Sequence, residues 1–243
     1  FDDVDTQGIG CDTCHRAWAS GLSNAPYYVG NAQIVYSNDL AKHGPYVTSN
    51  VPVHETFSDP PLSSANFCGQ CHQVTNPGRM LRDATGTQTN LEFPLDTTYQ
   101  EWQSSDFAGP GGMTCLDCHA ERRDADAPVA TSANAPMRPK PRGHAFVGAN
   151  LFGIRAVMAV DAARANAHAD AFALTLERTE KLLQSAVDVE ILSAPSMVNP
   201  GADVFVQVRI ENMSGHKFPT GYAEGRRAWL ALVWVDPQGH ETF

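Results

Sequence analysis

The spacing of apolar and polar residues divides the chain into three parts. Residues 1–125 contain no long periodic apolar run and are rich in Gly, Pro, Ser, Thr and Asn. Residues 151–185 place apolar side chains at helical spacing, which predicts one long helix. After residue 186 the spacing changes to the alternation of half-buried strands. We therefore expect a loop-rich domain at 1–145, a long helix at 146–186 and a β domain at 187–243.

The long helix is predicted from one apolar stripe. The stripe consists of Ile154, Met158, Ala162, Ala165, His168, Phe172, Leu176 and Leu183. A shorter helix is expected at 97–107, before the helix-breaking glycines and proline of 109–112. The proline-rich stretch at 128–141 is expected to be an extended strap over the first domain, or a linker.

The β part contains three recognisable strands. Residues 204–210 alternate between apolar and polar, 187–192 form a shorter strand, and 229–235 form another before the turn at 236–239. A partial Ig-like β-sandwich fits best, although a sandwich needs roughly seven strands. A new strand begins at 240–243. We expect either that this is the N-terminal portion of a longer polypeptide or that a partner supplies the missing strands.

One pentapeptide pattern, C-x-x-C-H, occurs three times and uses all six cysteines. The copies are Cys11-Asp12-Thr13-Cys14-His15, Cys68-Gly69-Gln70-Cys71-His72 and Cys115-Leu116-Asp117-Cys118-His119. This is the pattern for covalent attachment of c-type haem. The two thiols form thioethers to one porphyrin, and the histidine that follows binds its iron. The sequence therefore predicts three covalently bound haem c groups.

Other uses of the six cysteines explain less of the pattern. Three disulfides would suit an exported protein but require no histidine after each pair. Two C-x-x-C pairs can close a zinc site, which leaves the third pair and the histidines unexplained. A thioredoxin-like motif needs one such pair, in a strand-to-helix turn.

Each iron also needs a ligand on its distal side. The six other histidines are His43, His54, His144, His168, His216 and His240. This surplus favours bis-histidine ligation, while Met80, Met113 and Met137 leave Met/His ligation open. We expect distal ligands at His54, His144 and His216, with His43 in reserve. His168 is expected to be a core residue of the helix, and His240 a surface residue.

Several segments resemble multihaem cytochromes c, a family that includes proteins of bacterial respiratory chains and of extracellular electron transfer. They are residues 54–72, Thr98-Tyr99-Gln100-Glu101-Trp102, Met113-Thr114 with the third motif, Gly143-His144-Ala145-Phe146-Val147-Gly148, and Asn212-Met213-Ser214-Gly215-His216-Lys217-Phe218-Pro219-Thr220-Gly221-Tyr222. The resemblance implies an electron carrier with histidine axial ligands. The expected fold is mixed: a loop-rich, partly α-helical multihaem cytochrome c domain, one long helix, then the partial sandwich.

Charge and hydropathy limit the classes of partner and the cellular locations to be expected. With 27 acidic and 17 basic residues, the formal net charge is −10, which argues against a nucleic-acid partner. No run approaches the about 18 apolar residues of a membrane span. Residues 1–5 are acidic and unlike a signal peptide. Because cytochromes c are assembled outside the cytoplasm, we expect a periplasmic or extracellular protein whose leader was removed or is not included.

The predicted function is electron transfer through three closely spaced, mostly bis-histidine haems. The expected partners are other redox proteins or cytochrome subunits, including further copies of the chain, and a neighbouring subunit that completes haem ligation. The alternative is a multihaem oxidoreductase that acts on a small nitrogen or sulfur compound at a haem with an open distal site. Nucleotide-binding and serine-hydrolase motifs are absent, and Glu101 beside Trp102 is expected to be helix packing near a haem edge. A carrier is therefore favoured over an enzyme.

Overall fold

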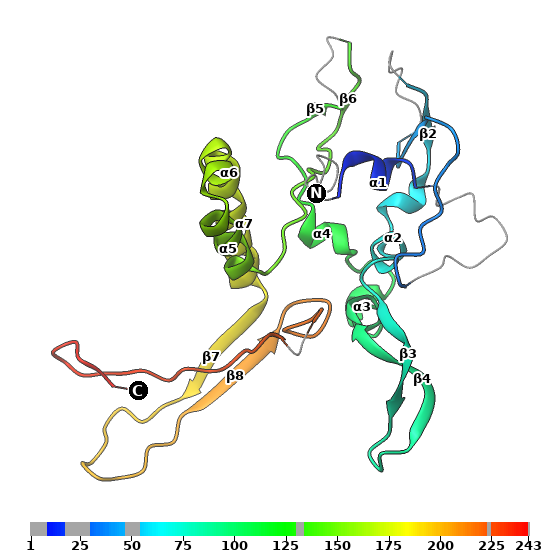
Figure 1. The fold of residues 1–243 in the computed structure, drawn as a ribbon. Helices are drawn as coiled ribbons and strands as arrows, with labels where there is room; N and C mark the ends of the chain where they lie inside the picture. The colour runs from blue at the N-terminus through cyan, green and yellow to red at the C-terminus, as the bar shows by residue number, and fades with distance from the viewer. Residues whose placement is uncertain (1–8, 18–29, 47–53, 130–133, 223–224, 243) are drawn as a thin grey trace.

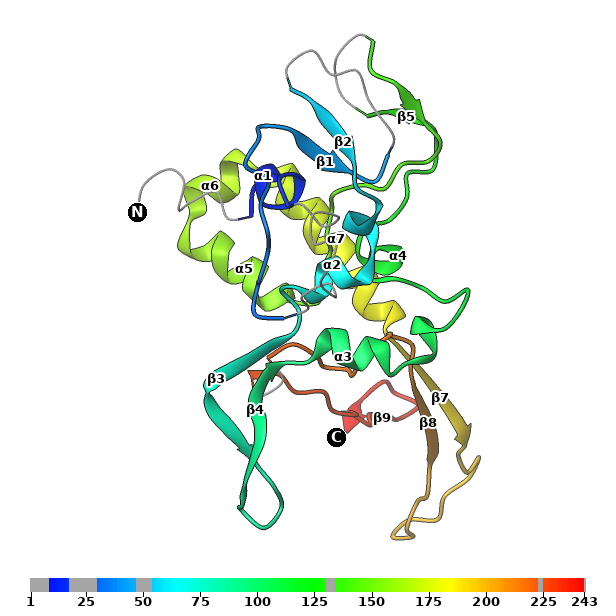
Figure 2. The same ribbon diagram turned by 90° about the vertical axis from the view of Figure 1, so that its right-hand side faces the viewer.

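The computed structural model describes residues 9–17, 30–46, 54–129, 134–222 and 225–242. Residues 1–5, on which the expectation of a removed leader depends, lie outside these ranges. Within them, short helices gather at the centre, a group of helices lies to one side, and two long hairpins extend away from the centre (Figures 1 and 2).

Each cysteine motif lies on or beside a very short helix. These helices are α1 (Cys11–His15), α2 (Ala65–Gly69) and α4 (Cys115–His119). A capping box starts α4, because Thr114 and Asp117 satisfy each other's exposed backbone N–H groups. Isolated helices of this length are marginal in water, so their stability must come from what packs around them.

Helix α3 (Thr98–Gln103) packs against the second motif. A Cβ atom added at Gly69 would lie 2.5 Å from a ring carbon of Tyr99, so the aromatic ring rests on the glycine. A 3-10 turn, η2 (Asp106–Ala108), follows α3. Together they confirm the helix expected at 97–107.

A long hairpin between the second and third motifs was not expected from the sequence. Strands β3 (Val74–Arg82) and β4 (Gln88–Asp96) pair antiparallel with irregular register around Pro77 and Gly78. The sequence did not predict this strand because proline and glycine are typical of turns. The hairpin extends away from the motif helices, and its return strand ends next to α3 (Figure 2).

Smaller strand pairs and a 3-10 turn complete the first domain. Strand β1 (Lys42–Gly44) runs parallel to β2 (Thr56–Ser58), and η1 (Pro60–Ser63) leads into α2. Strand β5 (Ala127–Pro128) pairs with β6 (Met137–Arg138) inside the proline-rich stretch. That stretch therefore folds back on itself, which favours a strap over a linker.

The single long helix was a wrong prediction. The structure has three helices: α5 (Leu151–Val160), α6 (Ala162–Ala167) and α7 (Ala169–Ser185). Asp161 ends α5 and caps α6 by accepting a hydrogen bond from the N–H of Arg164. Helix α7 then runs back along α5 (Figure 1). Most residues of the apolar stripe are still buried or half-buried, but three helices share them. His168, expected in the core, is exposed at the α6–α7 junction.

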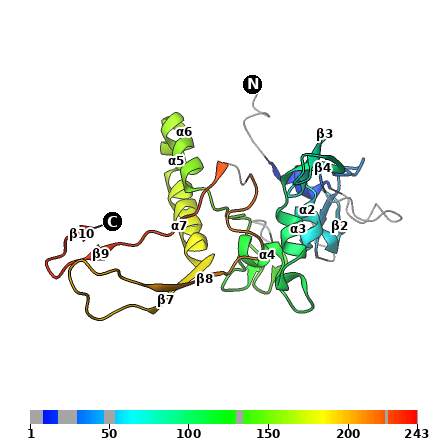
Figure 3. The same ribbon diagram turned by 90° about the horizontal axis from the view of Figure 1, so that it is seen from below.

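The expected β-sandwich is also not formed in the part of the chain that the structure describes. Strands β7 (Val187–Ser193) and β8 (Gln207–Asn212) form one antiparallel pair, and β9 (Trp234–Val235) and β10 (Glu241–Thr242) form another. These short C-terminal strands lie far from the motif helices (Figure 3). With no second layer over them, Phe205 and Trp229 are 84% and 80% exposed.

The described residues bury few large apolar side chains. The buried apolar residues are Ala17, Ala41, Ala65, Tyr99, Ala120, Ala127, Val147 and Ala165. Domains of this size normally bury many branched and aromatic side chains. Among the described helices, none is long and apolar enough to cross a membrane.

Candidate haem site

The fold brings the three cysteine motifs together, with the second motif between the other two. The Cys68 and Cys115 thiols lie close enough that each is the main cause of the other's shifted pKa, so the second motif lies against the third. Cys71 lies close enough to Cys14 to contribute to the raised pKa of that thiol. All six cysteines are described, and none forms a disulfide.

The thiol environments differ among the motifs. Burial raises the pKa of Cys14, Cys71 and Cys118, and the contact between Cys68 and Cys115 raises the pKa of Cys68 and lowers that of Cys115. The described residues contain no cluster of three or more His, Cys, Asp or Glu side chains that could hold a bare metal ion, so they do not form a four-ligand zinc site. A haem iron differs because the porphyrin leaves only its two axial positions to the protein.

Two of the three motif histidines have Nδ1 against a backbone carbonyl oxygen. His15 Nδ1 lies 2.7 Å from the carbonyl oxygen of His43, and His119 Nδ1 lies 2.5 Å from that of Val147. A carbonyl can only accept, so each Nδ1 carries the proton and donates it. Such a bond fixes the tautomer and leaves Nε2 available to a metal. His72 Nδ1 instead faces the Asp96 carboxylate, with 3.5 Å between Nδ1 and Oδ2.

The first motif histidine faces one of the predicted distal ligands. The rings of His15 and His144 have centroids 6.1 Å apart. Two imidazoles bound to opposite sides of one metal ion, with metal–nitrogen bonds of about 2.0 Å, have ring centres about 6.3 Å apart. The observed spacing therefore fits an axial ligand pair.

The third motif histidine has the same relationship to His216. Their ring centroids lie 6.3 Å apart and the rings are inclined by only 21°. His216 Nδ1 donates to the Lys217 carbonyl at 2.9 Å, so its Nε2 is also left for a metal. Ordinary aromatic contacts span the same distances, but here two separate pairs each join a motif histidine to an independently predicted partner.

The second motif histidine has no such partner among the described residues. The side chain of His72 is 65% exposed. His54, the distal ligand expected nearby, is half-buried, with Nδ1 3.0 Å from the carbonyl oxygen of Glu55. His43, the reserve, is only 4% exposed, with its ring beside Phe57 and 3.7 Å from the Asp59 carboxylate. Neither residue is brought against His72.

The segment from Arg142 to Val147 positions parts of two sites. Arg142 donates to the carbonyl of Leu116 at 2.6 Å and forms an ion pair with Asp117, which holds this segment along α4. Val147 then accepts the hydrogen bond from His119. Between these anchors, His144 turns toward His15. One segment thus braces the third motif and supplies the predicted distal ligand of the first.

The pKa values of His119 and His144 are both lowered, which favours the neutral form that binds metals. Burial is the main cause of the lowered pKa of His119, and the neighbouring imidazoles of His216 and His72 add to it. Burial likewise lowers the pKa of His144, with further contributions from His15 and Arg123. A neutral imidazole is the metal-ligating form.

The loop that carries His216 is docked on α3. Lys217 N–H and the Thr220 hydroxyl both donate to Glu101 Oε2, at 3.1 and 2.7 Å. Sequence reasoning gave Glu101 only a packing role. No local signal showed its partners, because they lie more than 110 residues further along the chain.

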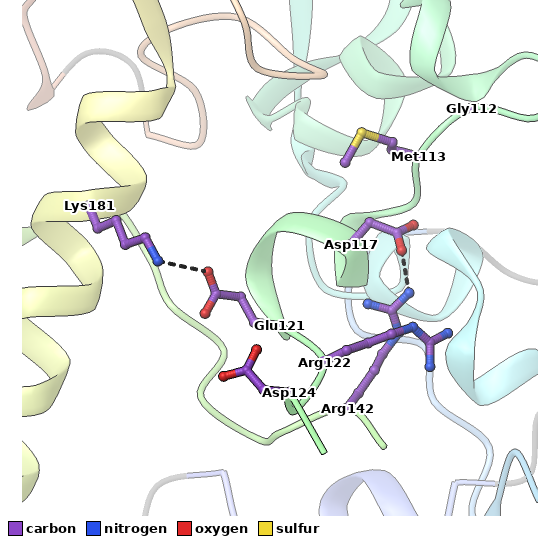
Figure 4. A pocket seen from close by; sticks show the side chains of 8 residues that line it. All are labelled: Gly112, Met113, Asp117, Glu121, Arg122, Asp124, Arg142 and Lys181. Carbon is purple, nitrogen blue, oxygen red and sulfur yellow. Dashed lines mark hydrogen bonds and ion pairs between the residues drawn. The ribbon is translucent and has the colours of Figure 1, made fainter. Parts of the chain in front are cut away.

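A hollow between α4 and α7 is lined by groups of both charges (Figure 4). Its two ion pairs are Asp117 with Arg142 and Glu121 with Lys181. Met113, a possible sulfur ligand from the sequence, lies on its wall and contributes its carbonyl to the indole N–H of Trp102. This mixed polar lining does not fit an apolar ligand.

Comparisons with known proteins add no relatives. No family model, curated protein or solved structure was found to match the chain. The assignment of the site therefore depends on the motifs and on the geometry described above.

Proposed function

We propose that the protein is a triheme c-type cytochrome that transfers electrons. The observation that carries this proposal is the pairing of His15 with His144 and of His119 with His216, at 6.1 and 6.3 Å. Each pair joins a C-x-x-C-H histidine to a histidine far along the chain. This is the arrangement expected of bis-histidine axial ligation.

The thin core supports the same proposal. Almost all buried apolar side chains of the described residues are alanines. Three covalently attached porphyrins would supply the large apolar surfaces that the chain lacks. The haem iron supplies the one-electron redox chemistry, while the protein sets axial ligands, hydrogen bonds and solvent access.

The arrangement of motifs supports a relay with the second haem in the middle. Cys68 lies against Cys115 of the third motif, and Cys71 lies near Cys14 of the first. Groups attached at these thiols would be close neighbours. We propose a periplasmic or extracellular location and partners among other redox proteins or cytochrome subunits, on the basis of haem attachment and the acidic balance.

The first experiment counts the haems and determines their spin states. The intact mass should exceed that of the polypeptide by three haems, and oxidised protein should show low-spin EPR signals for the first and third haems. His144→Ala should convert one haem to a high-spin form, whereas the exposed His168→Ala should change nothing. Extractable haem, or a mass increase of fewer than three haems, would contradict the proposal.

A second candidate function is reaction of a small nitrogen or sulfur compound at the second haem. The lack of a described histidine against His72 favours it, because an open axial position is what a substrate needs. One high-spin signal in the wild-type protein, shifted by added nitrite or sulfite, would support this oxidoreductase. Three low-spin signals that these anions leave unchanged would support the carrier.

A further inference from the structure

Glu101 accepts hydrogen bonds from two points of the loop that carries His216. Its side chain is 12% exposed. Oε2 accepts from the Thr220 hydroxyl at 2.7 Å and from the Lys217 N–H at 3.1 Å, so the donors lie on both sides of Phe218 and Pro219. The other oxygen, Oε1, accepts from Thr97 on the same element as Glu101, at 2.8 Å.

The other side of the loop is fixed by close packing. A Cβ atom at Gly215 would lie 3.2 Å from Trp102 and 3.3 Å from Phe107, so this glycine lies directly on the aromatic side chains of α3 and η2. The carbonyl of His216 also accepts from the Asn212 side chain at 2.7 Å. His216 is therefore held between a packed glycine and a lysine N–H bound to a carboxylate.

These contacts constrain the ring of His216 where it faces His119. An axial ligand on a loop needs its backbone fixed on both sides, because a displacement of about 1 Å removes most of the benefit of a preorganised site. Here the fixation comes from α3, a helix that carries no ligand itself but packs on the second motif through Tyr99.

We propose that Glu101 is the positioning residue for His216 as the distal ligand of the third haem. This inference depends on the proposed haem function. Removing the carboxylate leaves His216 in the sequence but frees its loop. The expected result is a third haem that loses its low-spin state while all three haems stay attached.

The test compares Glu101→Gln and Thr220→Val with His216→Ala in the holoprotein. Both loop variants should turn part of one haem out of three high-spin by EPR, and added imidazole should restore the low-spin signal. Glu177→Gln and Thr175→Val make the same kinds of change at exposed positions on α7. These two controls should keep the wild-type spectrum.

The outcomes separate this inference from the proposed function. If His216→Ala produces a high-spin haem but both loop variants keep the wild-type spectrum, Glu101 has no positioning role and the haem proposal stands. If the wild-type protein lacks three attached haems, the proposed function itself fails. Should Glu101→Gln fail to fold, Thr220→Val decides, because it removes only one hydroxyl from the loop.

Discussion

At the scale of single residues, the three motif histidines differ in the acceptor that faces Nδ1. His15 and His119 donate to neutral backbone carbonyls, whereas His72 faces the carboxylate of Asp96. The other oxygen of Asp96 is occupied by the N–H and hydroxyl of Thr98, at 2.9 and 2.6 Å. The carboxylate is thus held in place, and a negative partner makes an imidazole ligand more basic.

Under the proposed haem function, we predict that Asp96→Asn raises the reduction potential of the haem at the second motif. A more basic ligand favours the ferric iron, so removing the charge favours the ferrous form. The expected rise is about 60 mV, which corresponds to a tenfold change in a one-electron equilibrium. Redox titration followed by visible absorption measures it. Asp83→Asn removes the same charge at the exposed tip of the hairpin and should leave all three potentials unchanged.

At the scale of elements, the contact between α2 and α3 tolerates no added side chain. A methyl group at Gly69 would overlap the Tyr99 ring, whereas Gly10, which precedes the first motif, has nothing within 4 Å. We predict that Gly69→Ala destabilises the holoprotein by about 1–3 kcal/mol, the usual cost of overpacking. Gly10→Ala is the matched control. Thermal unfolding that shows equal stability for the two variants would contradict the described packing.

The docking of the His216 loop on α3 should depend on pH, through the ionisation of Glu101. Burial alone would raise the pKa of Glu101, but hydrogen bonds from Thr220, Thr97 and Lys217 lower it below the ordinary value of 4.5. Because the folded pKa is depressed, the carboxylate stabilises docking above pH 4.5, and this contribution is lost as the pH falls through the folded pKa. Two charged groups face Glu101. Lys217 Nζ lies 3.6 Å from Glu101 Oε1. The Asp96 carboxylate is connected to Glu101 through the hydroxyl groups of Thr98 and Thr220.

A pH titration of the third haem from 7 to 3 checks this dependence. Wild-type protein should keep its low-spin signal down to about pH 5 and lose it below the ordinary glutamate range. Glu101→Gln should show the weakened signal at every pH, with no further step from this carboxylate. A wild-type transition near neutral pH would contradict the lowered pKa.

The sequence predicted those elements whose signals are local. Helix α3, β7 and the turn at 236–239 follow from a nearby helix-breaking cluster, from alternation and from turn residues. The prediction of one long helix was wrong because Asp161 can cap a new helix as well as continue an existing one. The apolar stripe is the same in both cases. For the site, the motif cysteines and histidines could be predicted directly, and His144 and His216 were predicted from their loop positions together with the family resemblance. Glu101, Asp96 and Arg142 were missed, because their roles arise from contacts with distant segments.

At the scale of the whole molecule, the second motif lies between the first and the third. Under the proposed triheme function, we predict that Cys68→Ala with Cys71→Ala, which would remove the second haem, slows electron exchange between the other two. Removing the first haem, by Cys11→Ala with Cys14→Ala, should leave exchange between the second and third fast. Flash reduction followed by absorption measures both. Equal exchange rates in the two variants would show that the second haem is not the relay.

The contact between Cys68 and Cys115 has a consequence for maturation under the proposed haem function. Before haem is attached, two thiols from different motifs would lie together, and oxidation by the disulfide-forming machinery of an exported compartment would join them with loss of two hydrogens. Such a bond would block one attachment point in each of two motifs. Haem attachment and disulfide formation would then compete for the same thiols. Cells short of haem should therefore accumulate a form with a Cys68–Cys115 disulfide. Mass spectrometry without reductant would detect it.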